Sequence, residues 1–276
     1  YEIHERLVGS EMCIRDRDGE AQKGVYPKDV ILEVLGRIRA DGAVYKAIDF
    51  TGSYVEKLNV AGRMTICNMA VEMGAKTAYM QPNADVLNYV DKRAVRPYEV
   101  QFTDPDFQYE ESYVFDVSKI EPNLACPSSV ENVHPLSEVV ANGPIKLNQG
   151  YIGSCTGGRV EDIAIAAKIL KGRHIPEYTR LIVVPASNEV MQECMKAGYI
   201  QDLMNAGATI TTPGCGACLG AHEGILAPGE VCITSTNRNF PGRMGSTEAL
   251  MYLASPATVA ASMVNGCCLL YTSPSP

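Results

Sequence analysis

The chain lacks the excess of positive charge that binding to nucleic acid or to an anionic membrane requires. It contains 24 Lys and Arg residues against 32 Asp and Glu residues, which gives a net charge of −8. An acidic chain repels phosphate backbones and acidic lipid headgroups, so neither is an expected partner. An anionic substrate must therefore be bound by a few arginines that act against the overall field.

Long apolar runs and a secretory leader are also missing. No run approaches the length of about 20 apolar residues that a membrane-spanning helix needs, and no secretory hydrophobic segment is present. The chain has ten cysteines, but it is not a small secreted domain of the kind that disulfides stabilise. Reduced thiols in the cytoplasm are the better interpretation. No internal repeat or low-complexity tract is present.

Length and composition predict a globular protein with one large domain or two ordinary ones, since 46% of its 276 residues are hydrophobic. Residues 1–17 show no clear helical or strand periodicity of apolar residues and no starting Met. Residues 267–276 do not continue the pattern of the last expected helix. We interpret both ends as non-native and exclude them from the fold prediction. We therefore assign no function to His4, Cys13 and Cys268. The chain is expected to be a fragment.

Residues 18–130 are expected to form a first α/β domain. Apolar residues on one face predict an amphipathic helix from Val30 to Ile38. The Pro and Ser content of residues 121–129 indicates a linker, and residues 97–111 read as an exposed connection. Further helices are expected over residues 58–73 and from 82 onward, and strands over 43–50, 76–80 and 113–117.

Residues 131–266 are expected to form a second α/β domain in which strands alternate with helices. The continuous apolar run Leu181–Val184 is typical of a strand buried on both faces. Three of the strands end in loops rich in Gly, Cys, Asn and Arg, which is where open α/β sheets place their sites. Strands are expected over residues 145–152, 180–185, 208–212 and 230–235, and helices over 160–170, 189–197, 200–205, 247–253 and 256–264.

Two of these loops carry cysteines beside glycines. Cys155 lies alone in Gly-Ser-Cys-Thr-Gly-Gly-Arg, and Cys215 and Cys218 form a C-x-x-C pair in Pro-Gly-Cys-Gly-Ala-Cys-Leu-Gly. Glycines permit positive φ and close backbone approach. Three soft thiolates on tight loops suit a metal or an iron–sulfur cluster better than a packed core.

The residues alone leave three other interpretations open. His222 follows Cys218 by four residues and would complete a four-ligand structural zinc site with the three cysteines. The cysteines could also be buried free thiols, because Cys is among the most buried residue types. A thioredoxin-like redox pair is the third alternative, although such a pair needs no third cysteine.

The motifs resemble those of the aconitase superfamily. G-S-C-T-G-G-R-x-E-D and P-G-C-G-A-C-L-G are similar to its cluster motifs, and the stretches Met64–Glu72 and Thr236–Arg243 agree as well. Within the superfamily, the resemblance is greatest to the large subunits of 3-isopropylmalate dehydratase and homoaconitase, and it covers roughly residues 18–266. It implies an α/β fold of aconitase-like three-layer α/β/α units, with two of the large-subunit domains present and the N-terminal domain missing.

The resemblance also implies roles for individual residues. Cys155, Cys215 and Cys218 would bind three irons of a [4Fe–4S] cluster, which leaves one iron free of protein ligands. Arg238 and Arg243 would bind substrate carboxylates, which agrees with the planar, bidentate fork of a guanidinium. Either arginine alone would read as a solvated surface charge. The remaining implied roles are those of Asn237 and Asn68, near the cluster, and of Glu72, which would hydrogen-bond the hydroxyl or water at the open iron.

Asn68 and Glu72 are four residues apart, so both lie on one face of the helix predicted there. Without the resemblance, a solvated polar face would be the preferred interpretation. The remaining cysteines match no motif and are interpreted as structural: Cys67, Cys126, Cys194 and Cys232.

The implied activity is that of an iron–sulfur hydro-lyase that isomerises 3-isopropylmalate and 2-isopropylmalate by dehydration and rehydration, in leucine biosynthesis. The implied partner is the small subunit of such an enzyme. Homoaconitate, dimethylmalate or citrate are alternative substrates within the family, and a non-catalytic zinc-binding module is the alternative outside it. Because the family's other acid–base groups lie in the missing domain and in the small subunit, the isolated chain is expected to be inactive.

Overall fold

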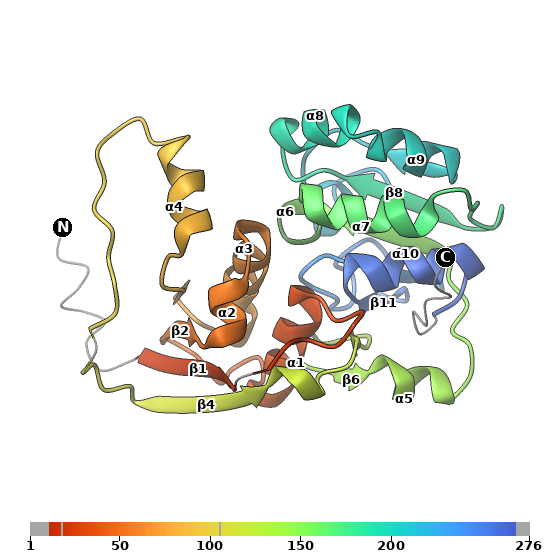
Figure 1. Ribbon diagram of the computed structural model, residues 1–276. Coiled ribbons are helices and arrows are strands. Elements are labelled where there is room, and N and C mark those ends of the chain that lie inside the picture. Colours follow the sequence, from red (N-terminus) through yellow and green to blue (C-terminus); the bar gives the residue numbers. More distant parts are fainter. Residues whose placement is uncertain (1–10, 18, 105, 269–276) are drawn as a thin grey trace. The chain divides into compact units, whose positions relative to one another are not determined.

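The structure, a computed structural model, describes residues 11–17, 19–104 and 106–268. The described chain forms two compact units. Of the described residues, unit 1 contains those up to Lys23 and those from Ile38 to Ile120, and unit 2 contains Gly24–Arg37 and those from Glu121 to Cys268. Each unit has its own sheet, and the two are described separately (Figure 1). Within the described ranges, the helices are too short or too polar to cross a membrane.

Unit 1 is built on a sheet with the strand order β3-β2-β1-β4, in which all neighbours are parallel. Val55 N at the start of the first helix donates to Asp16 Oδ2 at 2.9 Å, so a strand carboxylate positions that helix. The strands are β1 (Glu11–Arg17), β2 (Ala47–Thr51), β3 (Thr77–Tyr79) and β4 (Glu111–Asp116). The helices are α2 (Ser53–Lys57), α3 (Val60–Met69), α4 (Ala84–Asp91) and the 3₁₀ helices η2 (Ala70–Met73) and η3 (Val117–Lys119).

The structure differs from the expectations for unit 1 in three places. The sequence pattern assigns no element to residues 11–17, whereas β1 is an inner strand whose Met12 and Ile14 are buried. Charged residues interrupt the alternation of apolar and polar side chains in this segment, so its sequence does not indicate a strand. It forms a strand by pairing with β2 and β4. The single helix expected over residues 58–73 changes to a 3₁₀ helix after Met69. Helix α2 lies in residues 53–57, to which the sequence pattern assigns no element.

Unit 2 contains a larger sheet in the order β6-β5-β11-β10-β7-β8-β9. From β11 to β9 all neighbours are parallel, whereas β5 and β6 pair antiparallel. The strands are β5 (Asn123–Ala125), β6 (Val133–Pro135), β7 (Gln149–Gly153), β8 (Arg180–Val184), β9 (Ala208–Ile210), β10 (Val231–Thr234) and β11 (Leu250–Leu253). The helices are α1 (Pro27–Ile38), α5 (Leu136–Ala141), α6 (Ser154–Gly157), α7 (Val160–Leu170), α8 (Asn188–Lys196), α9 (Tyr199–Asn205), the 3₁₀ helix η4 (Gly216–Leu219) and α10 (Pro256–Asn265).

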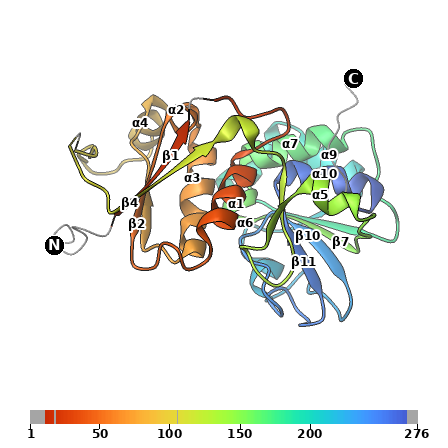
Figure 2. The same ribbon diagram turned by 90° about the horizontal axis from the view of Figure 1, so that it is seen from below.

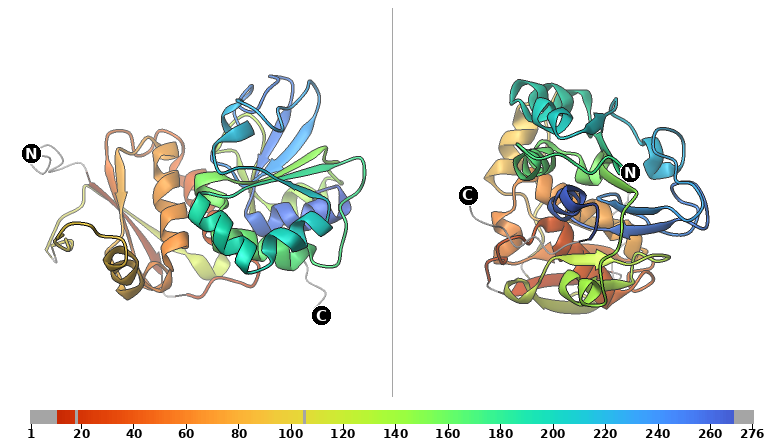
Figure 3. Two further views of the ribbon diagram at one scale, coloured as in Figure 1. Left: turned by 90° about the horizontal axis from the view of Figure 1, so that it is seen from above. Right: turned by 90° about the vertical axis from the view of Figure 1, so that its right-hand side faces the viewer.

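The two faces of this sheet bury different partners. Helices α7, α9 and α10 lie on one face, as Figures 2 and 3 show, and pack on Ile152, Leu181 and Ile233. Alternate side chains point to the opposite face because the strand period is two. There Tyr151, Ile182 and Cys232 pack against loop residues that include Ala217, Cys218 and Met244. The C-x-x-C loop therefore covers the face that the helices leave open.

Two expectations for unit 2 are wrong. The linker expected over residues 121–129 contains β5, in which Leu124 and Ala125 are fully buried. The helix expected over 247–253 is instead β11, which lies parallel to β10 with Met251 and Leu253 buried. Both segments are short, and their strand pairing outweighs the local composition that suggested otherwise.

The compact units divide the chain differently from the expected boundary at residue 130. Helix α1 begins in unit 2 because its first turn is bonded there. Lys28 Nζ donates to Thr236 O at 2.7 Å, and Asn123 N donates to Asp29 Oδ1 at 3.0 Å. Of the tail interpreted as non-native, residues 269–276 lie outside the described residues. Cys268 is buried and its N–H donates to Ile145 O.

Candidate functional site

Cys155 lies in a loop at the carboxyl end of β7, and the hydroxyl of Ser235 holds that loop in place. Ser235 follows β10, the neighbour of β7. Its Oγ accepts from Gly153 N at 3.0 Å and lies 3.2 Å from Gly153 O and 3.3 Å from Gly157 O. One buried side chain thus binds both ends of the short helix α6, whose Cys155 thiol is exposed.

The glycines of this loop are required by close packing. A Cβ on Gly157 would lie 2.6 Å from Ser235 Cβ, and a Cβ on Gly158 would lie 2.8 Å from Ser154 O. Real Cβ atoms do not approach so closely, so either substitution would displace the loop. The Gly-Gly pair of the motif therefore fixes the loop against the ends of β7 and β10.

The C-x-x-C loop is attached to the sheet through Tyr151 of β7. Tyr151 Oη donates to Cys215 O at 3.0 Å, and burial raises the pKa of Tyr151, which keeps the hydroxyl protonated as a donor. Cys218 N donates to Cys215 O at 2.9 Å within η4. Strands β7 and β9 are both parallel to β8, so the loops that follow them lie at the same edge of the sheet.

The three thiols share this edge, but their side chains do not form a cage in this structure. All ten cysteines are free, with Cys155 and Cys215 exposed and Cys218 buried. Among the residues that the structure describes, no group of three or more His, Cys, Asp and Glu side chains is placed to hold a metal ion. The ligand roles of the cysteines therefore stay predictions. His222 is exposed, and its Nδ1 lies 3.5 Å from Glu223 Oε2.

The loop after β10 carries Asn237, Arg238 and Arg243. The side chain of Asn239 holds the backbone of this loop in place. Asn239 Nδ2 donates to Cys126 O at 2.7 Å and lies 3.3 Å from both Ala125 O and Met251 O. The loop also contacts the C-x-x-C loop, because a Cβ on Gly220 would lie 3.1 Å from Arg243 O. The C-x-x-C loop and the backbone of Arg243 therefore lie side by side.

The guanidinium of Arg243 is only partly satisfied within the chain. Its Nε is buried and has no hydrogen-bond partner among the described residues. Its Cζ lies 5.6 Å from the centroid of the Phe240 ring, which orients the group without using its donors. A buried, unused N–H of a cation is what an anionic ligand would satisfy.

Asn68 and Glu72 belong to unit 1 and do not share an α-helical face. Asn68 lies at the end of α3 and is exposed, whereas Glu72 lies in the 3₁₀ helix η2 and is half-buried. The change of helix type removes the one-turn relation that the four-residue spacing implies. Arg63, which is buried, positions α3 by donating to Leu58 O, Gln81 O and Val55 O at 2.8–3.0 Å.

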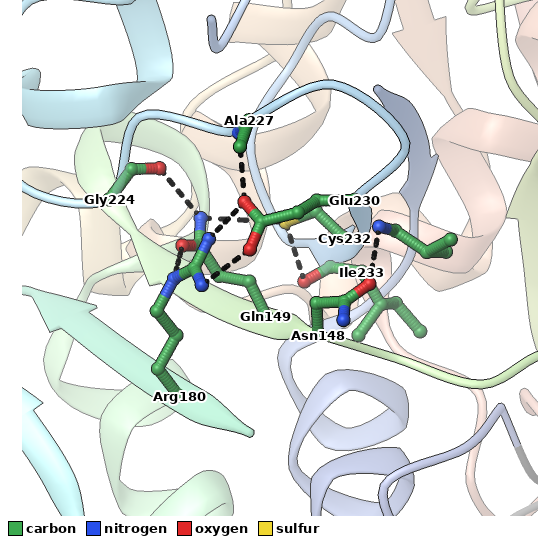
Figure 4. A network of polar contacts seen from close by, with 9 residues as sticks. Asn148, Gln149, Arg180, Gly224, Ala227, Glu230, Cys232 and Ile233 are labelled. Atoms are coloured by element: carbon green, nitrogen blue, oxygen red, sulfur yellow. Dashed lines mark hydrogen bonds and ion pairs between the residues drawn. The ribbon is translucent and has the colours of Figure 1, made fainter. Parts of the chain in front are cut away.

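The opposite, amino edge of the same sheet contains a separate polar network, drawn in Figure 4. Arg180 at the start of β8 donates to Gln149 Oε1 at 2.6 Å and forms a two-pronged ion pair with Glu230. Gln149 Nε2 in turn donates to Gly224 O, and Glu230 Oε2 accepts from Ala227 N. The network holds the return segment from the C-x-x-C loop to β10, so we regard it as structural.

Sequence reasoning missed Ser235 and Tyr151, the two side chains that hold the cysteine loops. The signal for Ser235 was available, since polar residues follow the buried run of β10 at the carboxyl edge. Nothing in the local pattern distinguishes Tyr151 from an ordinary core tyrosine.

Comparisons with known proteins agree with the motifs. The family model described as "Aconitase family (aconitate hydratase)" matches residues 15–266. A probable methanogen homoaconitase large subunit from Methanothermobacter thermautotrophicus is 50% identical over 248 residues, covering 90% of this chain and 57% of the relative. The 3-isopropylmalate dehydratase large subunit 1 of Methanopyrus kandleri is 51% identical over 251 residues, covering 90% of this chain and 59% of the relative.

Among solved structures, the chain resembles the aconitase X of Thermococcus kodakaraensis in its holo-form. The TM-score is 0.51 at 11% sequence identity, over 95% of this chain and 56% of the other. At that identity the likeness concerns the fold alone, and it confirms the expected aconitase-like α/β architecture. The chain spans about three-fifths of the length of the curated relatives that it matches, 57% and 59% for the two above.

Proposed function

We propose a hydro-lyase function for this chain, which belongs to the aconitase family. In this proposal it is part of the large subunit of a cytoplasmic enzyme that interconverts 3-isopropylmalate and 2-isopropylmalate in leucine biosynthesis. Its partner would be a small subunit, because the similar proteins are named large subunits. Membership of the family implies an iron–sulfur cluster in general terms, and we propose a [4Fe–4S] cluster held by Cys155, Cys215 and Cys218.

The observation that carries the proposal is the placement of three free cysteines on loops at one edge of a parallel sheet. Thiolates are the ligands that iron–sulfur clusters use, and none of these three is consumed in a disulfide. Ser235 and Tyr151 fix the backbone of the loops, while Cys155 and Cys215 keep exposed thiols. The donor set therefore suits the cluster in its chemistry, and the loops that carry it follow strands that end at the same edge of the sheet.

The chain's own residues would bind and orient the substrate. When bound, the cluster supplies a Lewis acid for the substrate hydroxyl and carboxylate. Arg238 and Arg243 would bind carboxylates, and the unused Nε of Arg243 supports its part. Asn237 would lie beside them. Asn68 would lie near the cluster, and Glu72 would hydrogen-bond the hydroxyl or water at the reacting centre.

A second substrate is favoured by a specific observation. The relatives named homoaconitase large subunits are 50% and 47% identical to this chain, close to the 51% and 47% of dehydratases. Homoaconitate is therefore the alternative substrate. Dimethylmalate or citrate have no such support, and a zinc site that includes His222 would oppose the whole proposal.

Anaerobic reconstitution with iron and sulfide tests the cluster, and the triple variant Cys155→Ser, Cys215→Ser, Cys218→Ser is the control. We expect a brown chromophore with about four irons per chain in the unchanged protein, since a [4Fe–4S] cluster contains four irons, and none in the variant. Colourless tetrahedral metal bound by the same residues would overturn the proposal. Assays of the enzyme with its small subunit on isopropylmalate and on homoaconitate would then separate the two substrates.

A further inference from the structure

Lys28 is a buried lysine that the proposed function does not use. Its residue exposure is 2%, and its Nζ donates to Thr236 O at 2.7 Å and lies 3.3 Å from Ser235 O. Lysine is rarely buried, because removing an ammonium from water is costly unless hydrogen bonds replace the water. Lys28 also lies in the first turn of α1, where a cation opposes the helix dipole. Its position is therefore not explained by the helix that carries it.

The backbone from which Lys28 projects is fixed. Asp29 Oδ2 accepts from Tyr26 N at 2.9 Å, and Asp29 Oδ1 accepts from Asn123 N at 3.0 Å. Asn123 Nδ2 lies 3.2 Å from Asp29 O, which adds a second link to β5. The start of α1 is thus bonded to strand β5, and the side chain of Lys28 extends from a fixed backbone.

The carbonyls that Lys28 binds belong to the segment on which both candidate loops depend. The Ser235 side chain holds the ends of the Cys155 loop, as described above. Thr236 immediately precedes Asn237 and Arg238, the predicted cluster-side and substrate-side residues. One ammonium therefore fixes the backbone at the point where these two loops meet.

We propose that Lys28 is a positioning residue that holds the end of β10, and thereby the Cys155 loop and the loop that starts at Asn237. Its ammonium also places a buried positive charge behind a site proposed to hold anionic thiolates and a carboxylate substrate. The carboxyls of Asp29, which follows Lys28 on the same helix, and of Asp162, on α7, lie near it. The electrostatic role of Lys28 rests on the proposed function, because it requires a bound cluster. The positioning role applies to the chain without a cluster.

Amide hydrogen exchange of the full chain tests the positioning part. In Lys28→Met, which keeps the length of the side chain but leaves two buried carbonyls unpaired, exchange in residues 153–159 and 235–239 should accelerate about tenfold. Exchange in residues 180–184 and 200–205 should not change. The matched control is Lys171→Met, because Lys171 is an exposed lysine of unit 2 paired with Asp202, and it should behave like the unchanged chain.

Reconstitution tests the electrostatic part. The cluster of Lys28→Met should lose iron to a chelator about tenfold faster, as expected for a lost charge-assisted contact, and should have a lower reduction potential than the unchanged chain. Identical exchange and identical cluster properties would overturn the inference. If the unchanged chain binds no cluster, the proposed function fails while the exchange experiment still decides the positioning role. Should Lys28→Met not fold, Ser235→Ala replaces it, and unchanged exchange in residues 153–159 of that variant would reject the inference.

Discussion

Ser235 shows how one residue can organise a site without contacting a ligand. Its hydroxyl binds Gly153 and Gly157, and its carbonyl lies 3.3 Å from Lys28 Nζ. Because these contacts are buried, water does not compete for them, and their loss would leave polar groups unpaired. The Cys155 thiol is consequently exposed on a loop whose backbone is fixed at both ends.

A first prediction at the residue scale concerns Arg238. In a full-length enzyme that carries this sequence, Arg238→Ala should weaken substrate binding by about 2–3 kcal/mol, the cost of losing a charge-assisted hydrogen bond. The visible absorbance of the cluster should be retained. The measurement is KM and kcat together with the absorption spectrum. Arg173→Ala is the control, since Arg173 is an exposed arginine in the same unit. Unchanged kinetics combined with loss of the cluster would contradict the assignment.

A second prediction concerns Asp162. Burial raises the pKa of its carboxyl from 3.8 to about 7, although Arg159 N donates to it and the charges of Arg159 and Lys28 oppose the rise. The folded chain thus binds this proton more tightly than the unfolded chain. Binding of this proton therefore stabilises the folded chain relative to the unfolded chain. This contribution to the free energy of unfolding is complete below pH 3.8 and is lost as the pH rises to about 7.

Asp162→Asn removes that titration and keeps an oxygen to accept from Arg159 N. The free energy of unfolding of the variant, relative to the unchanged chain, should therefore rise between pH 4 and 7 by at most about 1.4 kcal/mol per pH unit. Urea unfolding at several pH values measures it. A difference that does not vary with pH would show that Asp162 does not titrate in this range.

At the residue scale, the sequence identified side chains that carry a distinctive chemistry and missed those that support them. Cys155, Cys215, Cys218 and the two arginines stand out through motifs that resemble those of the family, because the residues alone also allow zinc ligands, buried thiols or solvated charges. Their roles stay predictions. Lys28 and Ser235 act through backbone carbonyls and amides far away in the chain, and no local pattern records such partners. Their signals were indirect, namely a cation in the first turn of a helix and a hydroxyl after a buried strand.

At the element scale, long periodic segments were predictable and short paired strands were not. Helix α7 spans the predicted residues, and β8 differs from its prediction by one residue. Strands β5 and β11 have three and four residues, too few to show a period, and their stability comes from neighbours in the sheet. The same limit applies to the change from α3 to η2, which separates Asn68 from Glu72.

The strand β5 gives a prediction at this scale. Leu124 is fully buried in the core on the helical face of the unit 2 sheet, so Leu124→Ala should lower the free energy of unfolding by about 2–5 kcal/mol. Met195→Ala is the control, because Met195 is exposed on α8 and its truncation should cost less than about 0.5 kcal/mol. Thermal and urea unfolding measure both variants. Equal, small effects would show that residues 121–129 behave as the linker that their composition suggests.

At the scale of the whole molecule, the chain supplies one part of the proposed reaction. It carries the candidate cluster ligands, two arginines, Asn237, and Asn68 and Glu72 in the other unit. None of these residues is assigned as the base that removes the carbon-bound proton. Several large apolar side chains of unit 2 are exposed near the cysteine loops, including Leu219, Ile225 and Phe240. Such surfaces suit contact with further protein.

The last prediction follows from that division of roles. Elimination from a hydroxy acid needs a base for the carbon-bound proton as well as an acid for the leaving hydroxyl, and a Lewis acid replaces only the second. The 276-residue chain, even after cluster reconstitution, should therefore not hydrate or dehydrate isopropylmalate or homoaconitate. A full-length large subunit of this sequence type, paired with its small subunit, should be active. An absorbance assay for the unsaturated acid, with and without the small subunit, measures both. Appreciable turnover by the chain alone would mean that one of its own side chains is the base, and Glu72 would then be the first residue to replace, as Glu72→Gln.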